Sequence, residues 1–194
     1  MTAAAPTRPQ SAADDEAALL ELIRARSFRR GRFKLASGVE SDLYFNLKPT
    51  MMHPQGAYLA ARAFIDRILA ENVDYVGGLE MGAVPIIGAL AAVSHSEGRP
   101  IRTFFQRKSV KEYGAQLAIE GLRPDESLAG KQVLVLDDVA TSGGSLIKTI
   151  DAVRAVGAHI DAALVLIDRQ EGAAETLAKL GVRLMSVFKA SQFM

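Results

Sequence analysis

Residues 133–145 read VLVLDDVATSGGS, and this stretch decides the fold. A run of valine and leucine is typical of a strand that is buried on both faces of a parallel sheet. Two aspartates follow the run, and then a short segment rich in hydroxyl groups and glycine. Ligands of open α/β sheets bind outside the carboxyl ends of the strands. We therefore expect a binding site at the end of this strand.

The segment Ala140 to Ser145 connects the strand to an expected helix. Gly143 and Gly144 allow a tight turn that brings several backbone N–H groups toward one point, and the helix start adds the positive end of its dipole. Hydroxyl donors stand at Thr141, Ser142 and Ser145. These features favour a site for one phosphate monoester. The motifs G-x-x-x-x-G-K-[ST] and G-x-G-x-x-G do not occur, which argues against the nucleotide P-loop and the dinucleotide fingerprint.

The adjacent carboxylates Asp137 and Asp138 would repel a phosphate group. Their expected targets are therefore neutral hydroxyls, or a hard cation such as Mg²⁺. A sugar phosphate satisfies both demands, with its phosphate in the loop and vicinal hydroxyls on the aspartates. The plainer alternative is a pair of solvated or capping aspartates, which the TSGGS segment makes less favourable.

Strands alternate with helices along most of the chain, which predicts an α/β fold with a mainly parallel sheet flanked by helices. The expected helices run to Arg26, from Pro54, and over residues 83–94, 144–156 and 173–180. The expected strands cover residues 33–35, 43–47, 75–78, 101–105, 132–137, 160–167 and 183–187. Residues 1–12 are rich in alanine, proline and threonine and are interpreted as a flexible tail.

Composition excludes several classes of protein. The 194 residues are 49% apolar and 23% charged, as in an ordinary single domain, and the net charge of +1 gives no bias toward nucleic acid or membrane partners. No cysteine is present, so disulfides and thiolate metal sites are excluded. No segment has the length of a membrane span or the apolar core of a signal peptide, so we expect a cytoplasmic protein. The histidines are scattered and show no metal-ligand spacing.

The segment VLVLDDVATSGGS resembles the phosphoribosyl-diphosphate (PRPP) signature of the type I phosphoribosyltransferases. The buried strand, the acidic pair and the T-x-G-G-[ST] loop occur in the same order. The resemblance implies one phosphoribosyltransferase domain over residues 13–194, with a small N-terminal hood formed largely by about residues 13–50. It implies that Asp137 and Asp138 contact the ribose hydroxyls and that the loop holds the 5-phosphate. The other residues of this segment expected to bind PRPP are Val139, Ala140, Thr141, Ser142, Gly143, Gly144 and Ser145.

Three further segments resemble the orotate phosphoribosyltransferases: FKLASGVESDLYFN (33–46), RKSVKEYGAQLAIEG (107–121) and LIDRQEG (166–172). The whole resemblance runs from about residue 30 to residue 172. It implies transfer of the phosphoribosyl group of PRPP to orotate, giving orotidine 5′-phosphate and pyrophosphate in pyrimidine (UMP) biosynthesis. It also implies Mg²⁺ held mainly by PRPP, with no protein ligand assured, and a homodimer in which each catalytic loop reaches the neighbouring subunit's site.

The expected catalytic loop carries Arg107, Lys108 and Lys111, which are three cations within five residues. Breaking the bond from ribose to pyrophosphate builds negative charge on the leaving group, which cationic side chains and Mg²⁺ stabilise. A closing loop also excludes water from the ribosyl cation. We expect all three cations to bind PRPP, and Lys111 to be the leading catalytic residue, with Asp137 and Asp138 as ribose anchors. Deprotonated orotate is itself the nucleophile. The plainer alternative is a solvated basic turn.

Arg169 is the expected partner of the base. A guanidinium fork matches a planar carboxylate, and orotate carries one. The resemblance implies that Arg169 binds this carboxylate, that Thr141 also contacts the base, and that the backbone at Tyr44 and Phe45 meets the orotate ring. A surface Asp–Arg pair with Asp168 remains the alternative for Arg169, and core packing remains the alternative for the two aromatic residues.

The segment GGLEMG (77–82) resembles the family's pyrophosphate loop, in which Gly77, Gly78 and Gly82 would let backbone amides approach phosphate oxygens. Related proteins carry a non-proline cis peptide bond here, expected near Glu80–Met81. The chain departs from the family at three positions. Tyr113 stands where many bacterial members have histidine, and Ala36 and Met81 stand where various members have lysine. Lys34 or Lys48 could replace the missing cations.

Two other functions are weighed against this one. A purine phosphoribosyltransferase should carry an aromatic base-stacking segment near the C-terminus, which is not found. A PRPP-binding regulator should lack the lysine loop or carry a nucleic-acid-binding domain, whereas this chain keeps Lys111 and is too short for a second domain.

Overall fold

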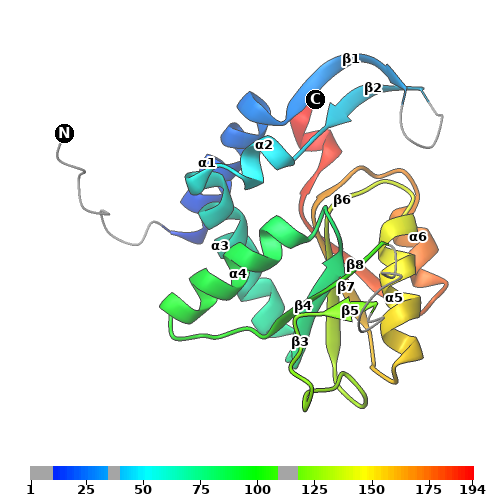
Figure 1. Cartoon of the computed structure of the whole chain (residues 1–194). Coiled ribbons are helices and arrows are strands. Elements are labelled where there is room, and N and C mark those ends of the chain that lie inside the picture. The colour runs from blue at the N-terminus through cyan, green and yellow to red at the C-terminus, as the bar shows by residue number, and fades with distance from the viewer. Residues whose placement is uncertain (1–10, 35–39, 109–117) are drawn as a thin grey trace.

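The strands β6 (Val133–Ala140) and β7 (Ala162–Asp168) form the centre of the molecule. They belong to a six-stranded sheet of order β5-β4-β3-β6-β7-β8, in which all neighbours are parallel except β5, which runs antiparallel to β4. The other strands of this sheet are β3 (Tyr75–Leu79), β4 (Thr103–Gln106), β5 (Ile119–Glu120) and β8 (Arg183–Lys189). The computed structural model describes residues 11–34, 40–108 and 118–194 (Figure 1).

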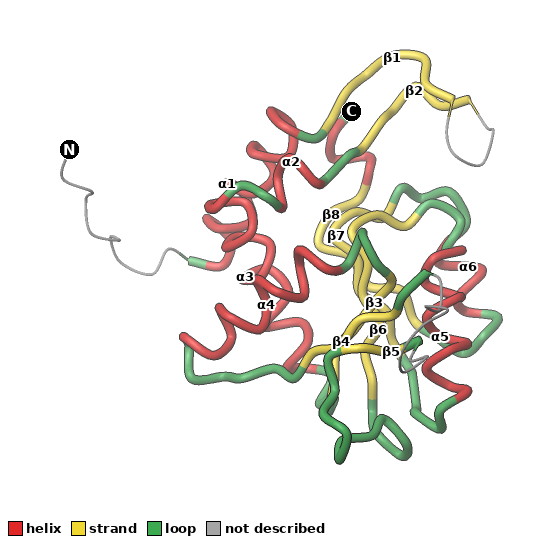
Figure 2. Tube along the Cα trace, in the orientation of Figure 1, coloured by secondary structure: helices red, strands yellow, loops and turns green. Residues whose placement is uncertain are grey.

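Successive residues of the central strands point to opposite faces of the sheet, so these strands separate two hydrophobic cores. Leu134 and Leu136 belong to one core, and Val133 and Val135 to the other. Helices α3 (Pro54–Ala70) and α4 (Val84–Ser96) cover the first face, and α5 (Gly144–Ala155) and α6 (Ala173–Ala178) cover the second (Figure 2). The mainly parallel sheet flanked by helices is therefore confirmed.

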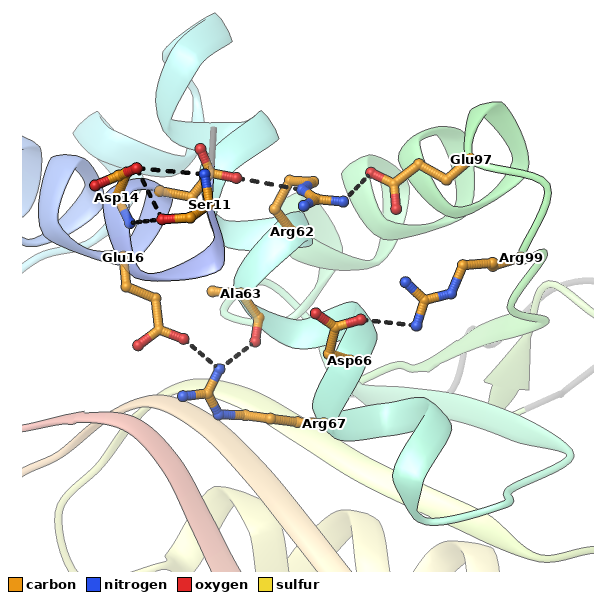
Figure 3. A network of polar contacts seen from close by, with 10 residues as sticks. Ser11, Asp14, Glu16, Arg62, Ala63, Asp66, Arg67, Glu97 and Arg99 are labelled. Atoms are coloured by element: carbon orange, nitrogen blue, oxygen red, sulfur yellow. Dashed lines mark hydrogen bonds and ion pairs between the residues drawn. The ribbon is translucent and has the colours of Figure 1, made fainter. Parts of the chain in front are cut away.

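Ion pairs join helix α1 (Ala12–Arg26) to α3, and join α3 to the end of α4 (Figure 3). Arg62 of α3 lies between Asp15, at 3.3 Å, and Glu97 at the end of α4, at 2.7 Å. Arg67 pairs with Glu16 at 2.7 Å. The hydrogen bond to Glu97 is the main reason that the pKa of Arg62 is raised, while burial acts in the opposite direction. These contacts add to the apolar packing of Leu19 and Ile23 in the first core.

A separate antiparallel hairpin, β1 (Phe28–Lys34) and β2 (Glu40–Phe45), stands at one end of the sheet (Figure 1). Phenylalanine rings attach it to the C-terminus. Phe28 and Phe45 lie 5.1 Å apart between ring centroids, and Phe193 lies 5.4 Å from the first and 5.1 Å from the second. Phe193 belongs to the short 3-10 helix η1 (Ala190–Phe193), which follows β8. The last residues of the chain therefore hold the hairpin against the sheet.

Several boundaries differ from the sequence-based expectations. The first hairpin strand begins at Phe28, whereas residues 33–35 were expected, because the charged segment RRGR lies on an exposed hairpin and carries little apolar periodicity. Helix α1 begins at Ala12, because the side chain of Ser11 and that of Asp14 form a capping box. The short helix α2 (Lys48–Met51) and η1 were not predicted. In the described part of the chain, the longest apolar stretches fall short of a membrane-spanning helix.

Candidate active site

A cavity of about 670 Å³ opens where β6 and β7 end and where the second hairpin strand leads into α2. Its walls come from three segments far apart in the sequence. They are Tyr44, Phe45, Asn46 and Lys48 from the hairpin side, Asp137 to Leu146 and Lys148 from β6 and α5, and Arg169 from the turn after β7. The structure thus brings together the acidic pair, the hydroxyl–glycine loop and the expected base-side residues.

The loop after β6 is shaped by Gly143. Its φ of +88° lies in the left-handed region, and a Cβ atom at this position would lie 2.8 Å from Leu177 Cδ1 of α6. Only glycine combines this backbone angle with this close packing. Gly143 is also the N-cap of α5, so the first N–H groups of the helix are directed toward the cavity end of the loop. The arrangement offers unpaired amides and a positive dipole end to an anion.

Asp137 and Asp138 lie inside β6, which continues to Ala140 instead of ending at Asp137 as expected. Oδ1 of Asp137 accepts a hydrogen bond from Asp138 N at 2.9 Å, and Oδ1 of Asp138 accepts one from Val139 N at 2.8 Å. Burial, followed by the charge of Asp138, raises the pKa of Asp137 to about 8, and the charge of Lys108 acts in the opposite direction. Near pH 7 this raised pKa favours the protonated form of the Asp137 carboxyl.

The glycines of the segment GGLEMG were expected to let backbone amides approach phosphate, but two of the three lie inside a strand. Gly77 and Gly78 lie within β3, where a Cβ atom would lie 2.5 Å from the ring of Phe104 and 2.0 Å from the carbonyl oxygen of Leu136. These two glycines therefore permit sheet packing and are not part of a loop that could meet phosphate. Gly82 does approach the site, because a Cβ atom there would lie 2.4 Å from Oδ1 of Asp137. The peptide bond Glu80–Met81 is cis, as the resemblance implied.

Arg169 lies at the boundary between the sheet and the hairpin, with its side chain only 4% exposed. Its backbone N–H donates to Ala140 O at 2.9 Å, which joins the turn after β7 to the end of β6. Its Nη2 donates to Leu43 O at 3.3 Å, and its guanidinium lies 5.9 Å from the ring centroid of Phe45. Arg169 thus belongs to the cavity wall and is not the exposed surface pair considered as its alternative.

The expected catalytic loop is described only in part. Lys111 and Tyr113 lie outside the described residues, as does Ala36, and the side chain of Lys34 is likewise outside them. Arg107 does not line the cavity; its Nη1 donates to Glu120 of β5 at 2.8 Å. The backbone N–H of Lys108 donates to Glu80 Oε1 at 2.9 Å, which joins the start of this loop to the GGLEMG segment.

The sequence did not predict three residues that line the cavity, Asn46, Leu146 and Lys148, or the partner of Arg169, Glu171. Lys148 follows Gly144 by four residues, so helical spacing alone places it on the same face of α5. Glu171 accepts hydrogen bonds from Arg169, which no sequence pattern indicated. His53, His95 and His159 lie apart, and the described residues contain no group of three histidine or acidic side chains able to hold a metal ion.

Comparison with known proteins places the chain in a family. A family model described as phosphoribosyl transferase domain matches residues 52–184. An orotate phosphoribosyltransferase from a Bradyrhizobium species is 53% identical over 92% of this chain and 96% of its own length. The chain belongs to the orotate phosphoribosyltransferase family.

Solved structures of this family share the fold. The crystal structure of Mycobacterium tuberculosis orotate phosphoribosyltransferase in complex with Fe(III) dicitrate matches with a TM-score of 0.78 and 36% identity, over 92% of this chain and 98% of that one. A structure of the same enzyme in complex with PRPP matches with a TM-score of 0.75 and 32% identity, over the same shares of the two chains.

Proposed function

We propose that this protein transfers the phosphoribosyl group of PRPP to orotate, giving orotidine 5′-phosphate and pyrophosphate in UMP biosynthesis. The observation that carries the proposal is a single cavity that has an anion-binding helix start on one wall and a buried arginine on another. PRPP requires the first and the carboxylate of orotate requires the second. The relatives' shared name supports the same reaction.

The phosphate and ribose of PRPP fit the β6 side of the cavity. The amides of residues 141–145 and the start of α5 would bind the 5-phosphate, and the hydroxyls of Thr141, Ser142 and Ser145 would complete its hydrogen bonds. Asp137 and Asp138 precede this loop in β6 and line the same cavity, where they would contact the ribose. Carboxylate oxygens accept hydrogen bonds from vicinal hydroxyls, and a protonated Asp137 would also donate one.

The base fits the Arg169 side. A charge-assisted hydrogen bond from the guanidinium to the orotate carboxylate would fix the ring in the cavity, and Thr141 and the backbone at Tyr44 and Phe45 stand close enough to line the same space. With the ring held, the deprotonated ring nitrogen faces the anomeric carbon. Positioning of the two reactants then supplies much of the rate enhancement.

Magnesium fits this site as a companion of PRPP. Among the described residues, the carboxylates that line the cavity belong to Asp137 and Asp138, and burial raises the pKa of Asp137 to about 8. Such a pair favours a metal held mainly by phosphate oxygens of the substrate, with Asp137 and Asp138 as second contacts at most. When bound, Mg²⁺ would neutralise charge on the leaving pyrophosphate.

Two further features belong to the proposal. Lys111, together with Arg107 and Lys108, would close over the pyrophosphate, in a homodimer whose subunits exchange these loops. The enzyme would act in the cytoplasm on small soluble substrates, with no nucleic acid or membrane partner.

The test is the loss of orotate absorbance on mixing the protein with orotate, PRPP and Mg²⁺, with adenine and hypoxanthine as parallel substrates. We expect loss of orotate that requires both PRPP and the metal, and a fall of about 100-fold or more in kcat for Lys111→Ala. Turnover of a purine instead of orotate would show that the base side was misassigned. Tight PRPP binding without any turnover would favour a PRPP-binding regulator.

A further inference from the structure

The turn after β7 places a carboxylate directly on the arginine of the base pocket. Oε1 of Glu171 accepts hydrogen bonds from Nη2 of Arg169 at 2.7 Å and from Nε at 3.0 Å. Both donors lie on one edge of the guanidinium plane. Glu171 is 38% exposed in its side chain, whereas the side chain of Arg169 is 4% exposed. The carboxylate of Glu171 is therefore partly exposed to solvent while it binds the buried guanidinium of Arg169.

The backbone explains how two residues so close in sequence meet in this way. Gln170, between them, has a φ of +61°, and its N–H donates to Asp168 Oδ1 at 2.8 Å. This left-handed residue reverses the chain, so the side chain of Glu171 returns alongside that of Arg169. Asp168, the partner of Arg169 in the alternative surface pair, instead stabilises the turn, and the guanidinium donates to Glu171.

We propose that Glu171 is a positioning residue for Arg169 and thereby determines selectivity for a base that carries a carboxylate. The proposal rests on the proposed transfer to orotate. An arginine side chain has several rotatable bonds, and fixing it before the ligand arrives removes an entropy cost from binding. With the Nε edge held by Glu171 and Nη2 also directed to Leu43 O, the guanidinium plane is fixed on both the turn side and the hairpin side.

The opposite role is competition, in which Glu171 would occupy the place of the substrate carboxylate and have to be displaced. Two observations favour positioning. The Glu171 side chain reaches Arg169 from the rim and is not among the residues that line the cavity, whereas Arg169 is. One oxygen of Glu171 accepts both hydrogen bonds, so the contact fixes the plane of the guanidinium.

Steady-state kinetics separate these roles. Glu171→Ala is expected to raise the KM for orotate about tenfold or more, as for loss of a charge-assisted contact, with the KM for PRPP unchanged. Glu171→Gln keeps an oxygen acceptor and should stay within about threefold of the wild type. Glu175 is an exposed acidic residue of α6 that does not line the cavity, so Glu175→Ala removes the same charge nearby and should have no effect. Preference for orotate over uracil, which lacks the carboxylate, should fall only in Glu171→Ala.

Arginine side-chain NMR gives a readout that needs no substrate. The Nε–H signal of Arg169, assigned by its loss in Arg169→Lys, should be sharp in the wild type and in Glu171→Gln. In Glu171→Ala it should broaden or exchange with water. A signal that persists in Glu171→Ala would overturn the proposal, even if the wild type proved inactive on orotate. A lower KM for orotate in Glu171→Ala would also overturn it, because it would show that Glu171 competes with the substrate. A rise in the KM values for both substrates together with a lower Tm would overturn it as well, because it would show a structural role.

Discussion

The turns after β6 and β7 lie side by side at the same edge of the sheet, yet they form their halves of the site in opposite ways. Ala140 and Asp168 are paired neighbours in the sheet, and Arg169 N donates to Ala140 O. The first turn presents backbone amides shaped by Gly143. The second presents one side chain, Arg169, which is held by contacts with Glu171, Leu43 and Phe45.

This difference determines which substitutions abolish binding at each turn. A site made of backbone amides depends on local φ and ψ angles, so it is sensitive to any residue that cannot adopt them. A site made of one side chain depends on neighbours from other parts of the chain, so its binding can be lost while the backbone stays intact. Substitutions in the two turns should therefore separate effects on PRPP and on the fold from effects on orotate.

The largest effect is expected for Gly143→Ala. The new side chain would require a positive φ and would meet Leu177 of α6. We expect a loss of about 1–3 kcal/mol in the free energy of unfolding and a PRPP affinity lower by about 100-fold. Gly144→Ala is the matched control, because an added Cβ would meet only Ser142 Oγ, at 4.0 Å, so its stability should stay within about 0.5 kcal/mol of the wild type. Denaturant unfolding and PRPP calorimetry measure both quantities, and equal losses in the two variants would contradict the role of the left-handed angle.

The next effect belongs to the other turn. Arg169→Gln should raise the KM for orotate by about 10–100-fold, which corresponds to a charge-assisted hydrogen bond of about 1.5–3 kcal/mol. The KM for PRPP should change by less than about twofold, because the β6 loop keeps its shape. Arg169→Lys should behave like Arg169→Gln, since an ammonium lacks the planar fork. A parallel rise in both KM values would show that the two turns do not act separately.

The same contrast explains what the sequence could predict. The β6 turn was predicted in detail, because a buried strand followed by glycines and hydroxyls has local consequences that the sequence displays. The Arg169 side chain was predicted by resemblance, but its partner Glu171 was not, since that contact depends on the left-handed angle of Gln170. The role of Gly77 and Gly78 was also misinterpreted, because it depends on residues far away in the sequence. These glycines leave room for the ring of Phe104 and the backbone of Leu136, and this close packing exists only in the assembled sheet of β3, β4 and β6.

Asp137 offers a test through stability. Its pKa in the folded protein is about 8, above the ordinary value of 3.8, so the folded state binds more protons between these values and wild-type stability falls as the pH rises from about 4 to about 8. Asp137→Asn removes this dependence while its amide oxygen still accepts from Asp138 N. The variant should therefore gain stability relative to the wild type as the pH rises from about 4 to about 8, because only the wild type loses stability over this range. Urea unfolding at several pH values measures this, and a difference independent of pH would contradict it.

The smallest effect is expected from Lys148. Helical side chains lean toward the N-terminus of their helix, so Lys148 leans over Gly144, which has no side chain, toward the phosphate loop. No ion pair involves it within the described residues, so its charge is available to the cavity. Lys148→Gln should weaken PRPP binding about two- to fivefold at low salt and less at high salt.

Lys179→Gln is the matched control for Lys148, because Lys179 is an exposed residue at the end of α6 that does not line the cavity. Calorimetric titration of both variants with PRPP at about 50 mM and about 500 mM salt compares a charge beside the loop with the same charge elsewhere. An equal loss in the two variants would mean that PRPP responds only to net charge. A small loss confined to Lys148→Gln would mean that the backbone amides of the β6 turn supply most of the affinity for PRPP and that Lys148 adds to it. The β7 turn differs, because there one side chain, Arg169, supplies the contact with orotate.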